Sequence, residues 1–497
     1  MNRVVLLFIA LSPLLLGVNG STCQRFIQER LTDALKAQSI EQYRQYAYLL
    51  AKQGNVDASE KLLATVSRDD TSIYWLSLLA QMGNVDAHFR LGMLNESSLH
   101  LDNLKIAAES GHAEAQYELA LLVDTRASRL YWLQKSADSG YLAAEIALYQ
   151  WYLLHEDTES AEPYLKRAAQ RDAESALLHG RLLWRAGSEH IATSAFTRAR
   201  ELGSDDARVF LALIKEGQRP ILPAKPERHS RLVEQASLAL SAQSNLPACA
   251  ITTQFVATSL ESFRQAKNVY QRFNEDERLS LLPMCALPPV WLKTLKCDDN
   301  WQNQPRLGCD IGDIAALSNV RDFSHVVVFA EHGKANVHNG IMYLDLADTY
   351  SVFVHELAHF AGFVDEYPLS SMMADMHCNR DSAPNLQIID PETFPEGAPL
   401  NWPVGVQPEQ YTKARTCNNH TYQAYKPVKS MTFMEYHDHG VIPPLYLQIW
   451  HKQLMNRSNL TPAFVNFSQY FSERGNAAQA QLWRERALAY QGQPVEQ

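Results

Sequence analysis

Two histidines and a glutamate stand at the spacing of a metal-binding helix. His355, Glu356 and His359 form the pattern H-E-x-x-H. Residues four apart on a helix share one face, one turn apart, so both imidazoles can bind the same zinc ion. Glu356 then lies beside the ion, where its carboxylate can deprotonate the attacking water and carry the proton to the leaving amine. The spacing therefore predicts a zinc-dependent hydrolase with Glu356 as general base.

The residues that follow predict a third ligand. Gly362 permits the helix to end and the chain to turn sharply. The turn would return Asp365, ten residues after His355, to the metal. Glu366 is the alternative ligand, or it holds a ligand in place. A helix with incidental histidines is the alternative interpretation, and the glycine and the acid at these spacings count against it.

The segment from His355 to Tyr367 resembles a known family. Its pattern, H-E-x-x-H-x-x-G-x-x-D-E-Y, is similar to that of the IgA-peptidase family of zinc metallopeptidases, a metzincin-like group in which an aspartate replaces the usual third histidine. The resemblance implies that His355, His359 and Asp365 bind Zn²⁺, that Glu356 is the base, and that the substrate is a protein or peptide. It does not imply that antibodies are cleaved.

The resemblance also implies a methionine turn beneath the zinc. Met434, in the segment 430–436, is the better candidate. Tyr436 matches the position of a tyrosine that stabilises the oxyanion in some metzincins, which makes it a candidate catalytic residue, although an ordinary core role fits as well. His437 and His439 follow closely as metal or substrate contacts, or as bystanders.

The surrounding sequence predicts a mixed helix and strand domain that carries this helix. Residues 255–273 predict a helix, and the β-branched run 325–330 predicts a buried strand. Residues 340–346 predict a second strand, which resembles the edge strand along which metzincins bind an extended peptide. The metal-binding helix would begin near Asp348 or Thr349, either of which can cap it.

The first half of the chain contains a degenerate repeat. Four similar pentapeptides begin at Gly54, Gly83, Gly111 and Gly140, spaced by 29, 28 and 29 residues, with looser copies at 172–174 and 203–207. A glycine after one helix and small alanines in the next are typical of stacked helix pairs. The units resemble the Sel-one-like and tetratricopeptide repeat families, although their period is shorter. A solenoid of this kind implies a surface that binds a protein partner.

The first residues predict an export signal. Arg3 precedes the apolar run Val4–Val18, and a small-residue cleavage site follows at 18–20. A membrane anchor is the alternative, but the run is shorter than the ~20 residues needed to span a bilayer. Lipidation at Cys23 is a third possibility. We therefore expect an exported protein, periplasmic or secreted, with no membrane span after signal cleavage.

Six of the seven cysteines lie between residues 249 and 417. An even number clustered in one region of an exported protein predicts disulfide bonds, and the absence of any C-x-x-C pair argues against a thiolate zinc site. Pairing of sequence neighbours is one of 15 connectivities, among which the sequence does not choose. Cys23 is left free or pairs between chains.

Composition excludes some partners and the length allows several domains. The formal net charge of -10 argues against nucleic-acid binding. The predicted fold is multidomain, an all-α repeat solenoid followed by an α/β metzincin-like zinc peptidase domain. The expected segments are a signal peptide (1–20), helical repeats (21–216), a linker or last repeat helix (217–245), the metallopeptidase domain (246–465) and a C-terminal helical segment (466–497).

Two other functions fit the same sequence. One is an exported repeat scaffold whose metal-binding domain no longer cleaves, although the intact Glu356 speaks against it. The other is a zinc amidase that acts on cell-wall peptides. Activity on casein or on peptidoglycan fragments distinguishes the candidates, and neither activity favours the scaffold.

Overall fold

The chain divides into two compact units, Met1–Arg208 and Val209–Gln497. The computed structural model describes residues 20–66, 72–94, 100–226, 249–303, 305–379, 383–390 and 412–492. Residues 1–19 of the predicted signal peptide lie outside the described residues, as does the possible helix at 232–240. None of the helices in the described ranges is long and apolar enough to cross a membrane.

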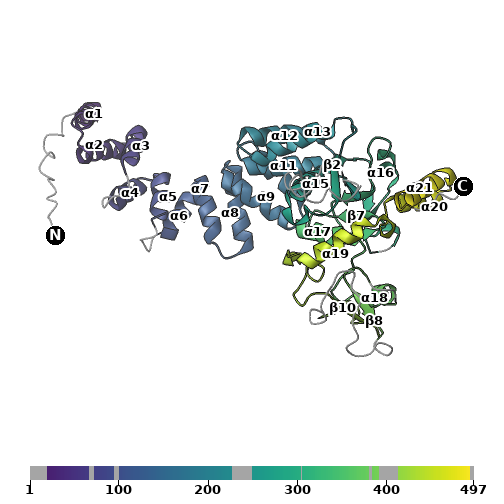
Figure 1. The fold of residues 1–497 in the computed structure, drawn as a ribbon. Helices are drawn as coiled ribbons and strands as arrows, with labels where there is room; N and C mark the ends of the chain where they lie inside the picture. Colours follow the sequence, from purple (N-terminus) through teal and green to yellow (C-terminus); the bar gives the residue numbers. More distant parts are fainter. Residues whose placement is uncertain are drawn as a thin grey trace. The chain divides into compact units, whose positions relative to one another are not determined.

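The N-terminal unit is built from helices that each pack against the next one in the chain (Figure 1). The last of the series, α13, spans the division between the units. The helices are α1 (Gly20–Lys36), α2 (Ile40–Lys52), α3 (Val56–Thr65), α4 (Ser72–Gln81), α5 (Val85–Gly92), α6 (His100–Glu109), α7 (Ala113–Leu122), α8 (Arg126–Asp138), α9 (Leu142–Leu154), α10 (Thr158–Ala168), α11 (Ala173–Arg185), α12 (Glu189–Glu201) and α13 (Asp205–Gly217).

The repeat glycines lie in the tight turns between paired helices. Gly54, Gly83, Gly111 and Gly140 have φ between 80° and 93°, the left-handed conformation expected of a glycine after a helix. After the first three of these glycines, the next side chain caps the following helix, as where Asn84 Oδ1 accepts a hydrogen bond from the backbone N–H of Ala87. The helical-repeat prediction is confirmed by these turns.

The C-terminal unit contains a five-stranded sheet in the order β2-β1-β5-β7-β6. Neighbouring strands are parallel, except that β6 is antiparallel to β7. The strands are β1 (Ile251–Ala257), β2 (Met284–Trp291), β5 (His325–Phe329), β6 (Asn336–His338) and β7 (Ile341–Leu344).

Helices cover both faces of this sheet. On one face, Phe255 of β1 contacts Phe273 of α15 (Leu260–Glu275) and Phe353 of α17 (Tyr350–His359). On the other, Val326 and Val328 of β5 share a core with three further helices. These are α16 (Gly312–Leu317), α20 (Phe464–Glu473) and α21 (Ala477–Tyr490). The predicted C-terminal helical segment thus packs against the sheet.

The prediction of a helix over 255–273 is wrong at its start. Residues Phe255–Ala257 end strand β1, and the helix begins at Leu260. Ser259 and Ser262 form a reciprocal capping box that fixes this boundary. The apolar residues before it fit a buried strand as well as a helix, and periodicity alone does not separate the two.

The prediction of the edge strand is also corrected. The strand at 340–346 corresponds to β7, which pairs with β5 on one side and β6 on the other. Within the described residues, the edge beyond β7 is therefore β6. No strand is predicted at 336–338, because three residues carry almost no strand periodicity.

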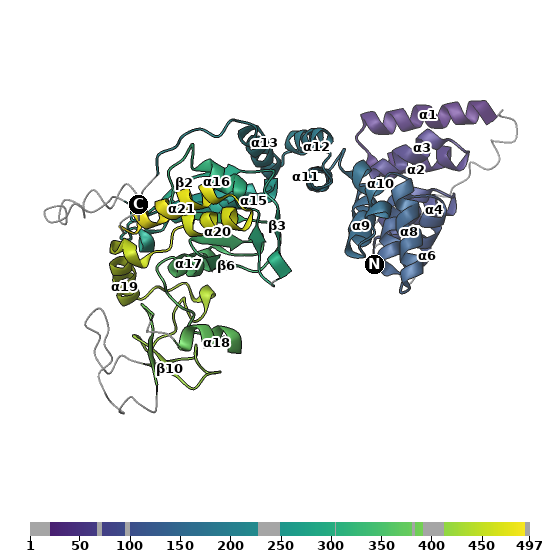
Figure 2. The ribbon, with the colours of Figure 1, turned by 90° about the vertical axis from the view of Figure 1, so that its right-hand side faces the viewer.

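A small lobe lies beyond α17, and both views show it set apart from the main sheet (Figure 2). It contains α18 (Ser371–Cys378) and an antiparallel sheet in the order β8-β10-β9. Its strands are β8 (Gln387–Ile389), β9 (Thr412–Ala414) and β10 (Gln423–Lys426). Outside it lie α19 (Pro444–Met455), the hairpin β3 (Cys297–Asp298) and β4 (Gly308–Cys309), and the short 3-10 turns η1 (Glu277–Leu279), η2 (Trp301–Asn303), η4 (His437–His439) and η5 (Arg457–Asn459).

The six clustered cysteines form three disulfide bonds between sequence neighbours. Cys249–Cys285 joins the beginnings of β1 and β2, Cys297–Cys309 closes the β3–β4 hairpin, and Cys378–Cys417 ties α18 into the small lobe. The disulfide prediction is confirmed, and Cys23 is free. Three disulfides are consistent with an oxidising environment.

Candidate metal centre

Helix α17 brings the three residues of the H-E-x-x-H pattern together. It begins after Thr349, as predicted, and packs under the sheet, so His355 and Glu356 are buried while His359 is partly exposed at the helix end. One ligand atom from each side chain lies within 4.8 Å of the others. The buried apolar residues of α17 pack the helix firmly, so His355, Glu356 and His359 are held on a rigid element.

The chain then turns back toward the helix. Gly362 has φ of 81°, in the left-handed region, just after the helix ends. Asp365 Oδ1 lies 2.9 Å from His355 Nε2 and 3.3 Å from His359 Nε2. The turn thus places the aspartate where the sequence predicts a third ligand.

Hydrogen bonds on the far side of each imidazole set its tautomer. His355 Nδ1 lies 2.8 Å from the carbonyl oxygen of Phe433, and His359 Nδ1 lies 2.7 Å from that of Phe363. A carbonyl oxygen only accepts, so each Nδ1 carries a hydrogen and donates it. In the neutral imidazoles both Nε2 atoms then present a lone pair toward Asp365, as in histidines that bind a metal.

The donor set fits a zinc ion. Asp365 Oδ1 is buried and has no hydrogen bond of acceptable geometry, although both Nε2 atoms are close to it. Three acceptor atoms facing one point repel one another unless a proton or a metal cation lies between them. Tetrahedral zinc with bonds of about 2.0–2.1 Å keeps its ligands roughly 3.3 Å apart, close to these separations. His355, His359 and Asp365 are therefore suited to hold zinc.

The electrostatics of the metal-free site also favour a cation. Burial opposes a charge on His359, but Asp365 and Glu356 outweigh burial and raise its pKa to about 9. Burial alone would raise the pKa of Asp365, yet the two histidines hold it well below its usual range. Glu356 has a raised pKa, chiefly because it is buried. In the absence of metal, a proton on His359 supplies positive charge that the carboxylates attract.

Tyr367 supports the third ligand from the side. Burial and the neighbouring Asp365 carboxylate raise the Tyr367 pKa far above its ordinary value, so its hydroxyl is protonated and donates to Asp365. The tyrosine ring is stacked against His355, with centroids 6.4 Å apart. Tyr367 therefore orients two of the proposed ligands, a role that the sequence left unassigned.

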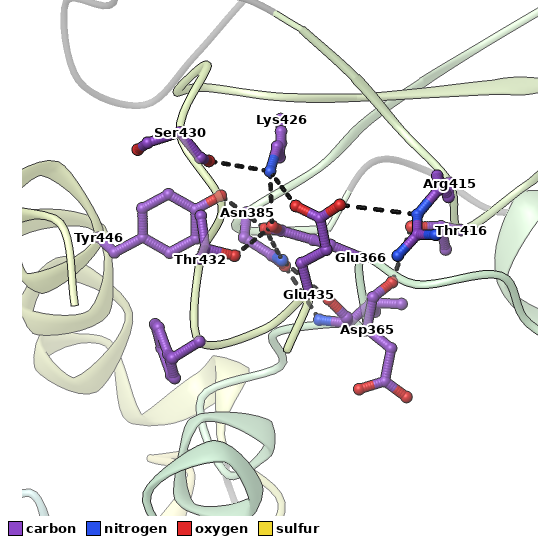
Figure 3. A network of polar contacts seen from close by, with 12 residues as sticks. Asp365, Glu366, Asn385, Arg415, Thr416, Lys426, Ser430, Thr432, Glu435 and Tyr446 are labelled. Atoms are coloured by element: carbon purple, nitrogen blue, oxygen red, sulfur yellow. Dashed lines mark hydrogen bonds and ion pairs between the residues drawn. The ribbon is translucent and has the colours of Figure 1, made fainter. Parts of the chain in front are cut away.

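The Glu366 side chain lies in a buried polar network (Figure 3), whereas the Asp365 carboxylate lies beside the two histidines. Its carboxylate accepts hydrogen bonds from Asn385, Thr432 and Tyr446, and Lys426 Nζ lies 3.8 Å away. The side chain is fully buried, and these partners differ from the carbonyl groups that His355 and His359 contact within the described residues. Of the two acids, the geometry favours Asp365 as the ligand and gives Glu366 a positioning role.

Asn385 is the member of this network that sequence patterns did not reveal. Its side chain exchanges two hydrogen bonds with the backbone of Val364, at 2.9 Å and 2.8 Å, and also donates to Glu366. Thr416 Oγ1 donates to the backbone oxygen of Asp365 at 2.7 Å. The small lobe therefore holds the turn that presents Asp365. No local pattern marks Asn385, because its partners lie about 20 residues earlier in the chain.

The methionine-turn segment lies against the site. Met434 is fully buried, and its carbonyl oxygen accepts a hydrogen bond from Glu366 N at 3.0 Å. The preceding residue, Phe433, supplies the carbonyl that orients His355. The segment at 430–436 thus contacts both the helix and the turn.

The other predicted site residues, which follow Met434 in the chain, lie at different distances from the proposed zinc ligands. Tyr436 is 52% exposed, and its ring lies beside that of His437 rather than against a ligand. The His437 ring centroid is 6.4 Å from that of His355. His439 ends η4 and has no contact with His355, His359 or Asp365 among the described interactions.

Replacing Tyr367 by phenylalanine tests the support of Asp365. Tyr367→Phe keeps the ring against His355 but removes the hydroxyl donor, and loss of such a partner weakens zinc binding by about 10- to 100-fold. Competition with a chromogenic chelator measures the affinity. Tyr436→Phe is the matched control, expected to bind zinc as the unmodified protein does; equal affinities for both variants would contradict the role of Tyr367.

Comparison with known proteins adds little to this geometry. No family model matches the chain, and no curated protein matches it. One similar solved structure is a protective antigen of uropathogenic Escherichia coli strains that displays an SLR fold, with 26% identity over 35% of this chain and 44% of that chain. The chain thus spans less than half of that protein's length. The TM-score of 0.29 is too low to carry an argument, so the repeat architecture rests on the turns described above.

Proposed function

We propose that the protein is an exported zinc-dependent metallopeptidase whose active site is built on α17. The observation that supports this most strongly is the convergence of three acceptor atoms, from His355, His359 and Asp365, on one buried point beside Glu356. Such a set holds a catalytic zinc ion through three protein ligands and leaves a fourth position open.

The chain's own residues supply the proton transfers. A bound zinc ion would lower the pKa of water and polarise the scissile carbonyl. Glu356 Oε2 lies 3.9 Å from His359 Nε2, beside the ligand atoms but not bonded to them. From there it takes the proton of the attacking water and delivers it to the leaving amine. Its burial raises its pKa toward the range of an efficient general base.

The developing oxyanion needs a hydrogen-bond donor from the protein. The resemblance to metzincins suggests Tyr436, which lies on the exposed side of the site segment. Its exposure allows the hydroxyl to swing toward a bound substrate, whereas a core tyrosine is fixed. His437 lies between Tyr436 and His355 and is the second candidate for this role.

An extended peptide is the substrate class that the sheet supports. Strand β6 is the edge of the sheet within the described residues, and α17 packs against β6 and β7. A peptide paired with β6 would run beside the catalytic helix. The helical repeats would bind a protein partner or the substrate protein, and the disulfides support a periplasmic or secreted location.

Cleavage of denatured casein and of peptidoglycan fragments by the zinc-loaded protein tests the proposal. The expected result is cleavage of casein that a chelator stops and that zinc restores. Cleavage of peptidoglycan peptides alone would identify a zinc amidase instead. Cleavage of neither, by a protein that binds zinc, would favour the repeat scaffold with an inactive metal site.

A further inference from the structure

A pocket lies on the opposite face of the sheet from α17, beside strand β6. It has a volume of about 80 Å³ and is bordered by the β3–β4 hairpin, by strands β6 and β7, and by helix α20. The residues that the argument uses are Trp301, Arg306, His338, Tyr470, Glu473 and Arg474. None of them belongs to the candidate metal centre.

Close packing builds the walls of this pocket. A Cβ on Gly308 would lie 2.5 Å from the Trp301 ring, so the glycine is what lets the indole lie against the hairpin backbone. On the other wall, the Arg474 guanidinium lies 3.7 Å from the centre of the Tyr470 ring. The disulfide Cys297–Cys309 closes the hairpin that carries Trp301. Close packing and a disulfide bond therefore define the walls of the pocket.

The pocket is lined by the acid Glu473 and by two arginines, of which one has an acidic partner within the described residues and the other does not. Arg474 lies 3.6 Å from Asp310, and Glu473 accepts a hydrogen bond from Gln469 within its own helix. Arg306 has no acidic partner among the described residues. His338 faces Arg306 as a neutral imidazole, because burial and the nearby guanidinium lower its pKa. A guanidinium without a counter-ion in a pocket is suited to a carboxylate.

The register of the sheet edge connects this pocket with a peptide on β6. Tyr343, opposite Asn336 in the β6–β7 pair, belongs to the core on the α20 side of the sheet. Side chains alternate between the faces of a sheet, and Asn336, His338 and Tyr343 all line the pocket. A peptide paired with β6 would therefore direct every second side chain toward α20 and the pocket, and the others toward α17.

We propose that this pocket binds the carboxylate of an aspartate or glutamate side chain in an extended peptide, with Arg306 as the residue that determines specificity. The inference rests on the proposed function, because it places the peptide on the same edge strand. The further claim is that preferred substrates carry an aspartate or glutamate at a peptide position whose side chain points to the face of the sheet opposite α17.

Peptide binding to the full-length Glu356→Gln protein tests the proposal without any cleavage. The probes are peptides blocked at both ends that contain glutamate at successive positions, each paired with its glutamine counterpart, and calorimetry measures their affinities. At one position, the glutamate peptide is expected to bind at least about tenfold more tightly, the value of a charge-assisted hydrogen bond. Arg306→Gln removes this preference, while Arg306→Lys retains part of it.

The control is Lys413→Gln, which removes an exposed positive charge from β9 in the small lobe, away from the pocket. It is expected to leave the preference intact. Equal binding of glutamate and glutamine peptides, no peptide binding, or a preference that survives Arg306→Gln would overturn the proposal. The proposal would also be overturned if peptides bound preferentially only when their C-terminal carboxylate is free. Because binding needs no catalysis, its failure is separate from a failure to cleave casein.

Discussion

Glu356→Gln is expected to lower kcat/KM for a cleaved peptide by about 10²- to 10⁴-fold, the contribution of a well-placed general base. The amide keeps the shape of the side chain but cannot take a proton from water. Because Glu356 lies beside the ligand atoms rather than among them, the variant is expected to keep its zinc. Initial rates on a fluorogenic peptide, together with zinc content, measure both effects.

Glu277→Gln is the control for this substitution, because Glu277 is exposed in η1, away from the ligands. It is expected to retain full activity and zinc. If Glu356→Gln cleaved at the normal rate, Glu356 would not be the base, and the assignment of the reaction to this site would fail. If it lost zinc as well as activity, Glu356 would be a ligand instead.

Glu366→Ala is expected to lower the free energy of unfolding by about 3–5 kcal/mol, the range for removing one partner of a buried charged network. Three hydrogen-bond donors, from Asn385, Thr432 and Tyr446, would lose their acceptor in a buried place. Lys426, which is 3% exposed, would keep only Glu435 as an acidic partner. Urea denaturation of the zinc-free protein measures the loss without a contribution from metal binding.

A control variant and a second measurement accompany the stability test of Glu366→Ala. Glu435→Gln removes the partly exposed acid that shares Lys426, and we expect a smaller loss because Glu366 remains beside the lysine. Zinc affinity of Glu366→Ala should also fall, since the turn that presents Asp365 is held through Glu366 and Asn385. A variant as stable as the unmodified protein would show that the network does not support the site.

The features that could be predicted from the sequence are those whose residues lie close together along the chain. His355 and His359 are one helical turn apart, so helix geometry places these two proposed ligands. Gly362 adopts the left-handed conformation with which the chain turns back toward Asp365. The repeat glycines are a similar case, because each one ends a helix within its own unit.

Features that depend on distant parts of the chain were missed or left open. Asn385 and Thr416 support the turn from residues 19 to 51 positions away, and no period marks them. The disulfide pairing follows from how β1 and β2 align, which the cysteine spacing does not determine. The edge strand was misplaced because β6 is too short to show an alternating pattern.

The most direct test of the central claim is the metal content of the purified mature protein by elemental analysis. We expect about one zinc per chain in the unmodified protein, and its loss in His359→Ala and in Asp365→Ala, because each removes one of three converging ligand atoms. Glu277→Gln should keep the metal. Absence of zinc from the unmodified protein, even after incubation with zinc, would contradict the account and favour a repeat scaffold without a metal site.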